Sequence, residues 1–232
     1  MTRVPHCAVE GNSGSGKTTT ARALAWEWEQ PGFVSEYFEY FEPLGLTMPE
    51  LPPPDEVVGR AQSIVWAVID QRRYADLSGV RSGTHLAVLD TTVLSVVACE
   101  MAKREFGRAS AAAEIAAEYR RLLDGGAFWP PDFWVLLETS YDELERRIVA
   151  RGGSRPFLRQ PEVVTYLHAF RASFAERYLS AHECIRLPSD AAATKEVVAA
   201  VTAHARSRGS AVTGDGLYRF LDDLACGVST VP

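Results

Sequence analysis

A glycine-rich octapeptide near the start of the chain has the residue types and spacing of a phosphate-binding loop. It matches the pattern GxxxxGK[ST] at every fixed position. The residues are Gly11, Asn12, Ser13, Gly14, Ser15, Gly16, Lys17 and Thr18. Glycines let consecutive backbone N–H groups point at phosphate oxygens, and the helix expected from residue 17 adds the positive end of its dipole. This loop predicts a site for the phosphates of a nucleoside triphosphate, for which we expect ATP.

Side chains in and beyond the loop indicate how such a nucleotide would be held. Lys17 can reach the β- and γ-phosphates, the Thr18 hydroxyl can ligate Mg²⁺, and Thr19 extends the site. Asp90 ends an apolar run, Leu86–Leu89, at the sheet edge where α/β proteins bind ligands. We expect Asp90 to position Mg²⁺ or to act as the general base, with a helix N-cap as the alternative.

Arginines are concentrated in a short segment after the fourth expected strand. Arg147 and Arg151 are four residues apart and share a helix face, and two glycines follow them. We expect an arginine-rich lid at about residues 151–160, in which Arg151 and Arg155 act on the γ-phosphoryl group and Arg147 helps to bind the nucleotide. A solvated basic turn is the alternative. The sequence shows no convincing guanine-recognition motif and only a fragment of an ABC-type signature, which favours a kinase.

Apolar runs and helical patterns alternate along the chain and predict an α/β fold with a five-stranded parallel sheet flanked by helices. We expect strands at residues 4–9, 33–41, 85–90, 133–137 and 183–187. Helices are expected at 17–29, 55–77, 95–106, 110–123, 141–151, 161–179 and 194–206. The pattern gives one catalytic domain, residues 1–208, and a C-terminal tail, residues 209–232, with weak helical character at 217–225.

Composition narrows the class of protein. The net charge is −6 and the isoelectric point about 5.4, which is unlike a non-specific nucleic-acid binder, so we expect no nucleic-acid partner. No apolar run is long enough to cross a bilayer, and we expect no membrane partner. The four cysteines form no CxxC pair, and the absence of a leader-like segment favours a cytoplasmic location.

Four segments in order resemble the thymidylate kinase family of P-loop nucleotide kinases, and more loosely the deoxynucleoside kinases. They are Glu10–Thr19, Asp90–Ala98, the run from Pro131–Phe133 to Arg147–Gly152, and residues 184–201. The resemblance covers about residues 4–205 and implies a P-loop kinase fold with a short lid. It also implies transfer to a nucleoside monophosphate or a nucleoside, a small-molecule acceptor, and leaves room for a homodimer.

The resemblance further suggests residues on the acceptor side. An arginine on the long second helix would hold an acceptor phosphate, and either Arg72 or Arg73 matches its position. Glu42 stands where deoxynucleoside kinases have a base, so it is a second base candidate beside Asp90. An aromatic acceptor could stack on Trp66 or Phe41, although core packing also accounts for such residues.

Two departures from the family pattern keep other functions open. Thr91 follows Asp90 where the family has arginine, and Phe41 precedes Glu42 where it again has arginine. The lost cations leave the identity of the acceptor open. One alternative is a kinase for a hydroxyl of another small metabolite or an antibiotic. A nucleotide-binding regulatory protein is another.

Overall fold

The computed structural model describes residues 6–28, 32–46, 55–79, 87–152, 157–190, 194–207 and 214–227. Its centre is a parallel sheet, in which the strands lie in the order β2-β3-β1-β4-β5. The strands are β1 (His6–Gly11), β2 (Phe33–Val34), β3 (Ala87–Asp90), β4 (Phe133–Glu138) and β5 (Cys184–Pro188). The predicted five-stranded parallel sheet is therefore confirmed. Because β1 lies between β3 and β4, the loop after β1 opens at the centre of the sheet's carboxyl edge.

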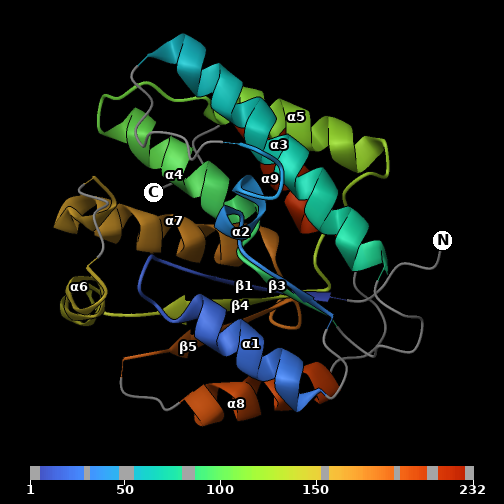
Figure 1. Cartoon of the computed structure of the whole chain (residues 1–232), viewed down its shortest axis with the longest axis vertical. Helices are drawn as coiled ribbons and strands as arrows, with labels where there is room; N and C mark the ends of the chain where they lie inside the picture. The colour runs from blue at the N-terminus through green and yellow to red at the C-terminus, as the bar shows by residue number, and fades with distance from the viewer. Residues whose placement is uncertain are drawn as a thin grey trace.

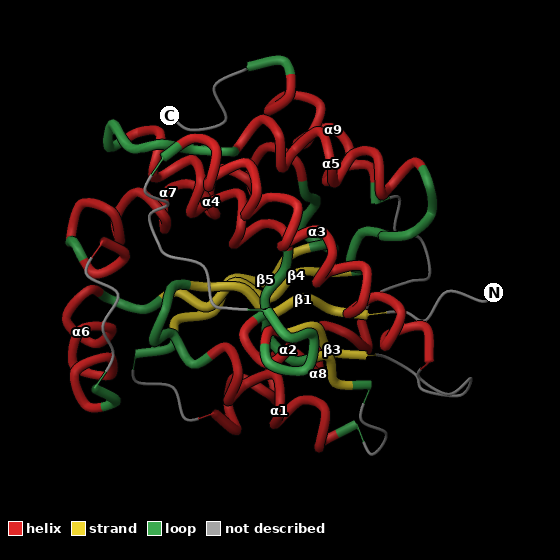
Figure 2. The backbone as a smooth tube through the Cα atoms, turned by 45° about the horizontal axis from the view of Figure 1, so that its top comes forward, coloured by secondary structure: helices red, strands yellow, loops and turns green. Residues whose placement is uncertain are grey.

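Helices cover both faces of this sheet (Figure 1). On one side lie α1 (Lys17–Glu27) and α8 (Thr194–Ser207). On the other side lie α3 (Glu56–Gly79), α4 (Val93–Glu105), α5 (Ala112–Asp124), α7 (Pro161–Tyr178) and α9 (Asp215–Ala225). The tube in Figure 2 shows the same two layers, with α6 (Tyr141–Ala150) at one end of the sheet. The 3₁₀ turn η1 (Phe157–Arg159) precedes α7.

Alternation along the strands decides which side chains meet which helices. In β1, Cys7 and Val9 pack with the α1 and α8 side, whereas Ala8 packs with the opposite side. In β4, Val135 packs with the α1 and α8 side, and Trp134 with the α7 side. All of these side chains are buried. A parallel sheet covered on both faces reads as continuous apolar runs, which is why the sequence predicts its strands well.

The segment after the second strand differs from the prediction. A strand was expected over residues 33–41, but β2 ends at Val34 and residues 38–41 form the short helix α2 (Phe38–Phe41). Phe41 is 2% exposed and packs edge-on against Trp66 of α3, with 5.5 Å between ring centroids. The aromatic residues that suggested a strand thus fill the gap between α2 and α3.

The C-terminal segment forms a full helix that joins the main core. Its apolar side chains Leu217, Phe220, Leu221 and Leu224 are buried in the same cluster as residues of α3, α4 and α7. At Gly216 a Cβ atom would lie 2.1 Å from the Tyr178 carbonyl oxygen, so the two backbones approach closely. Across the same interface the Tyr178 hydroxyl donates to Asp223 over 2.6 Å.

Within the described residues, no helix combines the length and apolar character needed to cross a bilayer. None of the four cysteines, all of which lie in the described ranges, forms a disulfide; Cys7 is buried and Cys226 is exposed.

Candidate active site

The glycine-rich loop is shaped by close backbone approaches at the end of β1. A Cβ atom at Gly11 would lie 2.5 Å from Ser15 Oγ and 2.9 Å from the Leu137 carbonyl oxygen, so only glycine fits. Gly16 has φ of 94°, a left-handed conformation that glycine adopts without steric cost. The turn is closed by the Ser15 N–H, which donates to the Asn12 carbonyl oxygen over 3.1 Å. These residues form a tight turn that leads directly into α1.

The start of α1 is suited to an anion. Gly16 provides no side-chain cap, and the first turn of the helix contains no acidic residue. The first N–H groups of a helix have no partners inside it, and together with the helix dipole they attract negative charge. Thr18 is half-buried in this first turn, and Thr19 is exposed. The arrangement is that of a phosphate-binding site.

Lys17 lies at the same helix end and carries the site's principal cation. Its Nζ donates to the Asn12 carbonyl oxygen over 3.1 Å. Burial lowers the pKa of the Lys17 ammonium, and the Asp90 carboxylate opposes that decrease. A lysine held this way has N–H donors left for phosphate oxygens.

A cavity extends from this loop toward the α3 side of the molecule. It encloses about 820 Å³ of empty space, part of which is open to solvent. One end is formed by the phosphate loop, and the opposite wall is aromatic and apolar. Its walls are formed by Gly11, Asn12, Ser13, Lys17, Glu36, Tyr37, Phe38, Trp66, Thr91, Ser95, Val96, Cys99, Glu100, Leu158, Leu167 and Arg171. The cavity thus joins the phosphate loop to an apolar, aromatic lining, a combination typical of ligand sites.

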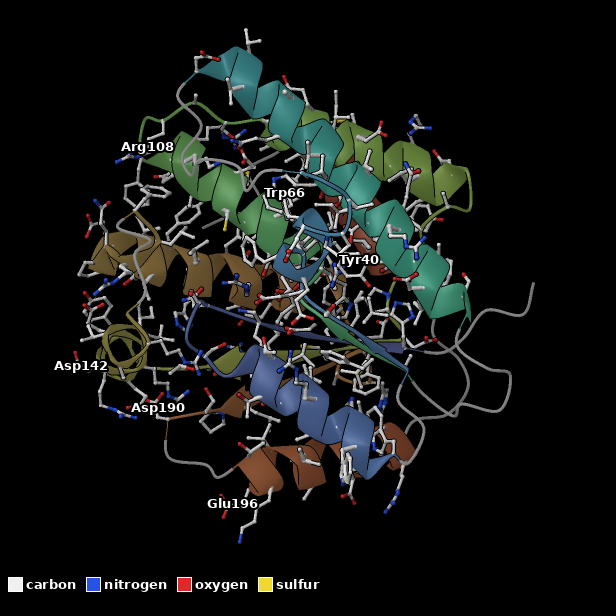
Figure 3. The ribbon with its side chains drawn as sticks, in the orientation of Figure 1. Tyr40, Trp66, Arg108, Asp142, Asp190 and Glu196 are labelled. Carbon is white, nitrogen blue, oxygen red and sulfur yellow. The ribbon has the colours of Figure 1, made fainter. Side chains whose placement is uncertain are left out.

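Trp66 forms part of the aromatic wall, as the sequence suggested, whereas Phe41 does not line the cavity. The Trp66 ring contacts Tyr37 and Phe38 edge-on, with centroid distances of 5.3 and 6.4 Å. Figure 3 shows Trp66 between α3 and α2, inside the layer of helices. Phe41 lies behind it and fixes its position.

Two carboxylates line the cavity among the described residues, Glu36 and Glu100, and the sequence reasoning identified neither of them. Glu36 lies two residues after β2, is half-buried and lines the cavity. Its charge acts to raise the pKa of Lys17, although burial outweighs this effect. Glu42, the predicted base candidate, is exposed at the end of α2 and does not line the cavity. A strand that stops at residue 34, rather than 41, brings the earlier glutamate to the sheet edge.

Asp90 ends β3 and is fully buried. Its Oδ1 accepts the Thr91 hydroxyl over 3.3 Å, and its Oδ2 has no hydrogen-bond partner. The cap of α4 is Thr92, whose Oγ1 accepts the Leu94 N–H, so Asp90 is not the cap. An unpartnered buried carboxylate oxygen close enough to act on Lys17 fits a role beside a cation.

Thr91 has an unusual backbone conformation, with φ of 68°. A β-branched residue in the left-handed region is strained, typically by about 1–3 kcal/mol. Arg73 stabilises this turn, because its Nη2 donates to the carbonyl oxygens of Asp90 and Thr91 over 2.6 and 2.7 Å. The turn that holds Asp90 is therefore fixed from α3.

The two arginines predicted to hold an acceptor phosphate lie elsewhere. Arg72 is on the outer face of α3 and pairs with Asp76, with 3.2 Å between Nε and Oδ1. Arg73 is fully buried, pairs with Asp70 over 2.8 Å and donates to the Ser35 carbonyl oxygen. Neither of them lines the cavity. Arg73 acts as a buried clamp between α3, β3 and the turn after β2.

The arginines of the predicted lid segment have diverse environments. Arg147 of α6 donates to the carbonyl oxygens of Gly14 and Ser15 in the phosphate loop, each over 3.3 Å. It also donates to the Ser189 carbonyl oxygen after β5 over 2.6 Å. Arg151 is exposed, and Arg155 lies outside the described residues. The structure thus connects Arg147 to the phosphate loop, and the lid stays a prediction.

A buried arginine of α7 also reaches the phosphate loop, and the sequence reasoning did not identify it. Arg171 is 6% exposed and lines the cavity. Its Nη1 donates to Asn12 Oδ1 in the loop. Its Nε lies 3.8 Å from Oε2 of Glu10, which is fully buried at the end of β1. The signal was a single charge on an otherwise apolar helix face, between Leu167 and Phe174.

Fold and site together define a parallel α/β architecture with a phosphate-binding loop after its first strand, and comparisons with solved structures agree on the fold. A deoxyadenosine kinase from M. mycoides, described with products dCMP and a flexible dCDP, gives a TM-score of 0.63 at 15% identity over 88% of this chain and 100% of that one. The same enzyme with bound dATP gives 0.60 at 13% identity over 87% and 100%. Thymidylate kinase from Candida albicans gives 0.57 at 13% identity over 87% and 90%.

At these identities the likeness establishes the fold of nucleoside and nucleotide kinases, as the sequence resemblance implied. No model of a known family matches the chain, and no curated protein matches its sequence.

Proposed function

We propose that this protein is an ATP-dependent kinase that phosphorylates a hydroxyl group of a small, ring-bearing molecule, with a nucleoside as the first candidate. The observation that carries the proposal is the cavity, which joins a phosphate loop with Lys17 to a wall formed by Trp66 and Phe38. A carboxylate, Glu36, lines the same space. A donor site, an acceptor pocket and a base are the parts that phosphoryl transfer needs.

In this reaction the acceptor oxygen forms a bond to the γ-phosphorus. The bond from that phosphorus to the β,γ-bridging oxygen breaks, and ADP leaves with the electron pair. The acceptor proton passes to a carboxylate, for which the cavity favours Glu36 over Glu42, with Asp90 as the other candidate. Lys17 stabilises the charge that develops on the transferred group.

Nucleotide binding rests on the loop residues 11–19 and on Arg147, whose contacts fix the loop from α6. Mg²⁺ would be held by the Thr18 hydroxyl and by Asp90, whose Oδ2 has no hydrogen-bond partner. When bound, the ion would neutralise charge on the phosphates. No cluster of three metal-ligating side chains occurs in the described chain, in keeping with an ion bound chiefly through phosphates and water. Arg151 and Arg155 are proposed to act on the γ-phosphoryl group from the lid.

The charges around the cavity favour an acceptor that is not yet phosphorylated. Among the described lining residues the cations are Lys17 and Arg171, and both lie at or next to the phosphate loop. The carboxylates that line the cavity are Glu36 and Glu100. Glu100 is neutralised by a buried ion pair with Lys103. Among the described lining residues no further cationic group is available to a phosphate dianion on the acceptor, so we favour a nucleoside over a nucleoside monophosphate.

The deciding experiment is an ATP consumption assay with Mg²⁺ and a panel of acceptors. The panel contains nucleosides, nucleoside monophosphates, and small hydroxylated metabolites and antibiotics. Turnover with a nucleoside supports the proposal. Turnover only with a different alcohol supports the metabolite-kinase alternative, which the absence of a cation at Thr91 keeps open. ATP binding with no turnover across the panel would instead favour a regulatory nucleotide-binding protein.

Three variants then assign the base. Glu36→Gln should lower kcat by at least about 100-fold, the lower end of the effect of a general base. Glu42→Gln, at an exposed position outside the cavity, should leave kcat within about twofold of the wild-type value. Asp90→Asn preserves the shape of the side chain, removes its charge and tests whether Asp90 is the base. A large loss in Glu42→Gln with none in Glu36→Gln would reverse the assignment.

A further inference from the structure

Arg171 is a buried cation that the fold supplies to the phosphate end of the cavity from a distant part of the chain. It lies on α7, 159 residues after Asn12 of the phosphate loop. Its side chain is 6% exposed, and it lines the cavity together with Lys17. Burying a guanidinium group is costly even when a carboxylate lies nearby, so the contacts of Arg171 decide what it can do.

The contacts of Arg171 use only part of its hydrogen-bonding capacity. Nη1 donates to Asn12 Oδ1 and, over 3.2 Å, to the Leu167 carbonyl oxygen. Nη2 donates to Ser95 Oγ over 3.2 Å. An arginine has five N–H groups, so one hydrogen on Nη2 is left, and Nε has no hydrogen-bond partner. The guanidinium group is thus held by three hydrogen bonds, and two of its N–H donors remain unused.

Glu10 is the charged partner of Arg171 inside the protein, but it does not use the remaining donors. The Glu10 carboxylate is 3.8 Å from Nε, and its own oxygens already accept the Thr92 N–H, the Thr92 hydroxyl and the Ser95 hydroxyl. Burial lowers the pKa of Arg171, and Glu10 opposes that decrease. The Nε hydrogen and one Nη2 hydrogen are therefore available to an acceptor in the cavity.

The position of Arg171 relative to Lys17 indicates which anion that is. Both side chains contact Asn12, Lys17 at its carbonyl oxygen and Arg171 at its side-chain Oδ1. Both also line the same cavity, and each acts electrostatically on the other. Two cations that contact the same loop residue and line the same cavity place positive charge next to the loop, which is where the terminal phosphate of a nucleotide must protrude toward an acceptor.

We propose that Arg171 binds the terminal phosphoryl group of the nucleoside triphosphate and stabilises it during transfer, opposite Lys17. The inference rests on the proposed kinase function. Arg171 would then supply a cation for the phosphates in a chain that has the uncharged Thr91 after Asp90. The cation comes from α7 and is held by Asn12, so it is part of the rigid core rather than of a lid.

The test compares ADP with a non-hydrolysable ATP analogue, each with Mg²⁺, by titration calorimetry. In Arg171→Met the affinity for the ATP analogue should decrease by about 10–100-fold, as expected for lost hydrogen bonds to a charged group. The affinity for ADP, which has no γ-phosphate, should change by less than about threefold. Arg171→Lys, which keeps the charge, should recover part of the preference for the triphosphate.

Arg177→Met is the matched control, because Arg177 lies on the same helix and is exposed. It should bind both nucleotides as the wild type does. If Arg171 only supports the loop through Asn12, ADP and the ATP analogue will weaken together in Arg171→Met, and the proposal is overturned. Unchanged affinity for both would overturn it as well. Should Arg171→Met fail to fold, Arg171→Lys decides alone. A loss of affinity for the ATP analogue without a loss for ADP supports the proposal, and the absence of such a selective loss overturns it.

Nucleotide binding can be measured without an acceptor, so this test gives a result whether or not the proposed kinase function is correct. A wild-type protein that binds both nucleotides but phosphorylates nothing would refute transfer and still show whether Arg171 contacts the terminal phosphate. A wild-type protein that binds neither nucleotide would refute both proposals.

Discussion

Lys17 is the residue at which the proposed chemistry is most directly tested. We expect Lys17→Ala to lower kcat by about 100–1000-fold, because contacts to charge that develops in the transition state are worth about 2.7–4 kcal/mol. Single-turnover transfer from labelled ATP measures this, and the unfolding transition should stay close to that of the wild type. Lys195→Ala, at an exposed lysine of α8, is the control. Near wild-type transfer in Lys17→Ala would contradict the kinase interpretation of the loop.

Thr91 provides a second test, of stability rather than activity. Its φ of 68° costs about 1–3 kcal/mol, and Thr91→Gly releases that strain at the cost of about 0.5–1 kcal/mol from glycine flexibility and of the 3.3 Å hydrogen bond from the Thr91 hydroxyl to Asp90. These losses offset most of the released strain, so the free energy of unfolding in urea titrations should stay within about 1 kcal/mol of the wild-type value.

The neighbouring change Thr92→Gly releases no such strain and should destabilise the protein more than Thr91→Gly does. Thr92 has φ of −137°, caps α4 and donates its hydroxyl to buried Glu10 over 2.6 Å. Losing a hydrogen bond to a buried charged group destabilises a protein by about 1–3 kcal/mol. If both glycine variants were destabilised alike, strain at Thr91 would not be the cause.

Local motifs and long-range contacts differ in how well a sequence reveals them. The phosphate loop could be predicted because its glycines, lysine and threonine are consecutive and act mainly through their own backbone. Arg171 could not, because its contact with Asn12 depends on how α7 packs on the sheet. For Arg73 a local signal existed, since Asp70 three residues earlier forms its buried ion pair.

At the scale of elements, α6 matters because it fixes the phosphate loop through one side chain. Arg147→Ala removes donors to Gly14, Ser15 and Ser189, and each hydrogen bond contributes about 1 kcal/mol. Allowing for partial replacement by water, we expect nucleotide affinity to decrease by roughly tenfold, measured by calorimetry with ADP and Mg²⁺.

Arg146→Ala is a close control for this change. Arg146 is the adjacent residue on α6 and pairs with the same Glu143, but its side chain is 69% exposed. Exposed pairs contribute at most about 1 kcal/mol, and this one has no contact with the loop among the described hydrogen bonds. Its nucleotide affinity should stay within about twofold of the wild-type value. Equal losses in the two variants would indicate a general effect on α6.

The region around β2 shows why element boundaries could not be predicted. Residues 33–41 have the aromatic content of a strand, but the last four pack as a helix against Trp66. The helical conformation of residues 38–41 depends on α3, because α3 contributes Trp66, which lies about 25 residues later in the sequence. Glu42 was a base candidate because of the family resemblance, whereas Glu36 is the glutamate after β2 that lines the cavity.

For the whole molecule, the order of elements could be predicted because both faces of the sheet are covered and every strand is a short apolar run. The packing of the C-terminal helix could not be predicted from its weak helical pattern. Phe220 and Leu221 are fully buried against α5 and α7, so residues 215–225 contribute to the core that also contains Trp66. The sequence had suggested a boundary at residue 208.

The cooperativity of that core leads to a prediction about nucleotide binding at a distance. Ligand at 100 times its dissociation constant stabilises a protein by about 2.7 kcal/mol, which slows hydrogen exchange by roughly 100-fold for amides that exchange only through global unfolding. If α9 unfolds with the sheet, amides of Phe220 and Leu221 should gain the same protection from ATP analogue and Mg²⁺ as those of Ala8 and Val9 in β1. Hydrogen-exchange mass spectrometry measures both segments in one sample, and Lys17→Ala should reduce both gains together. Protection that increases in β1 while α9 exchanges at its ligand-free rate would mean that residues 209–232 unfold separately and would support a boundary at residue 208.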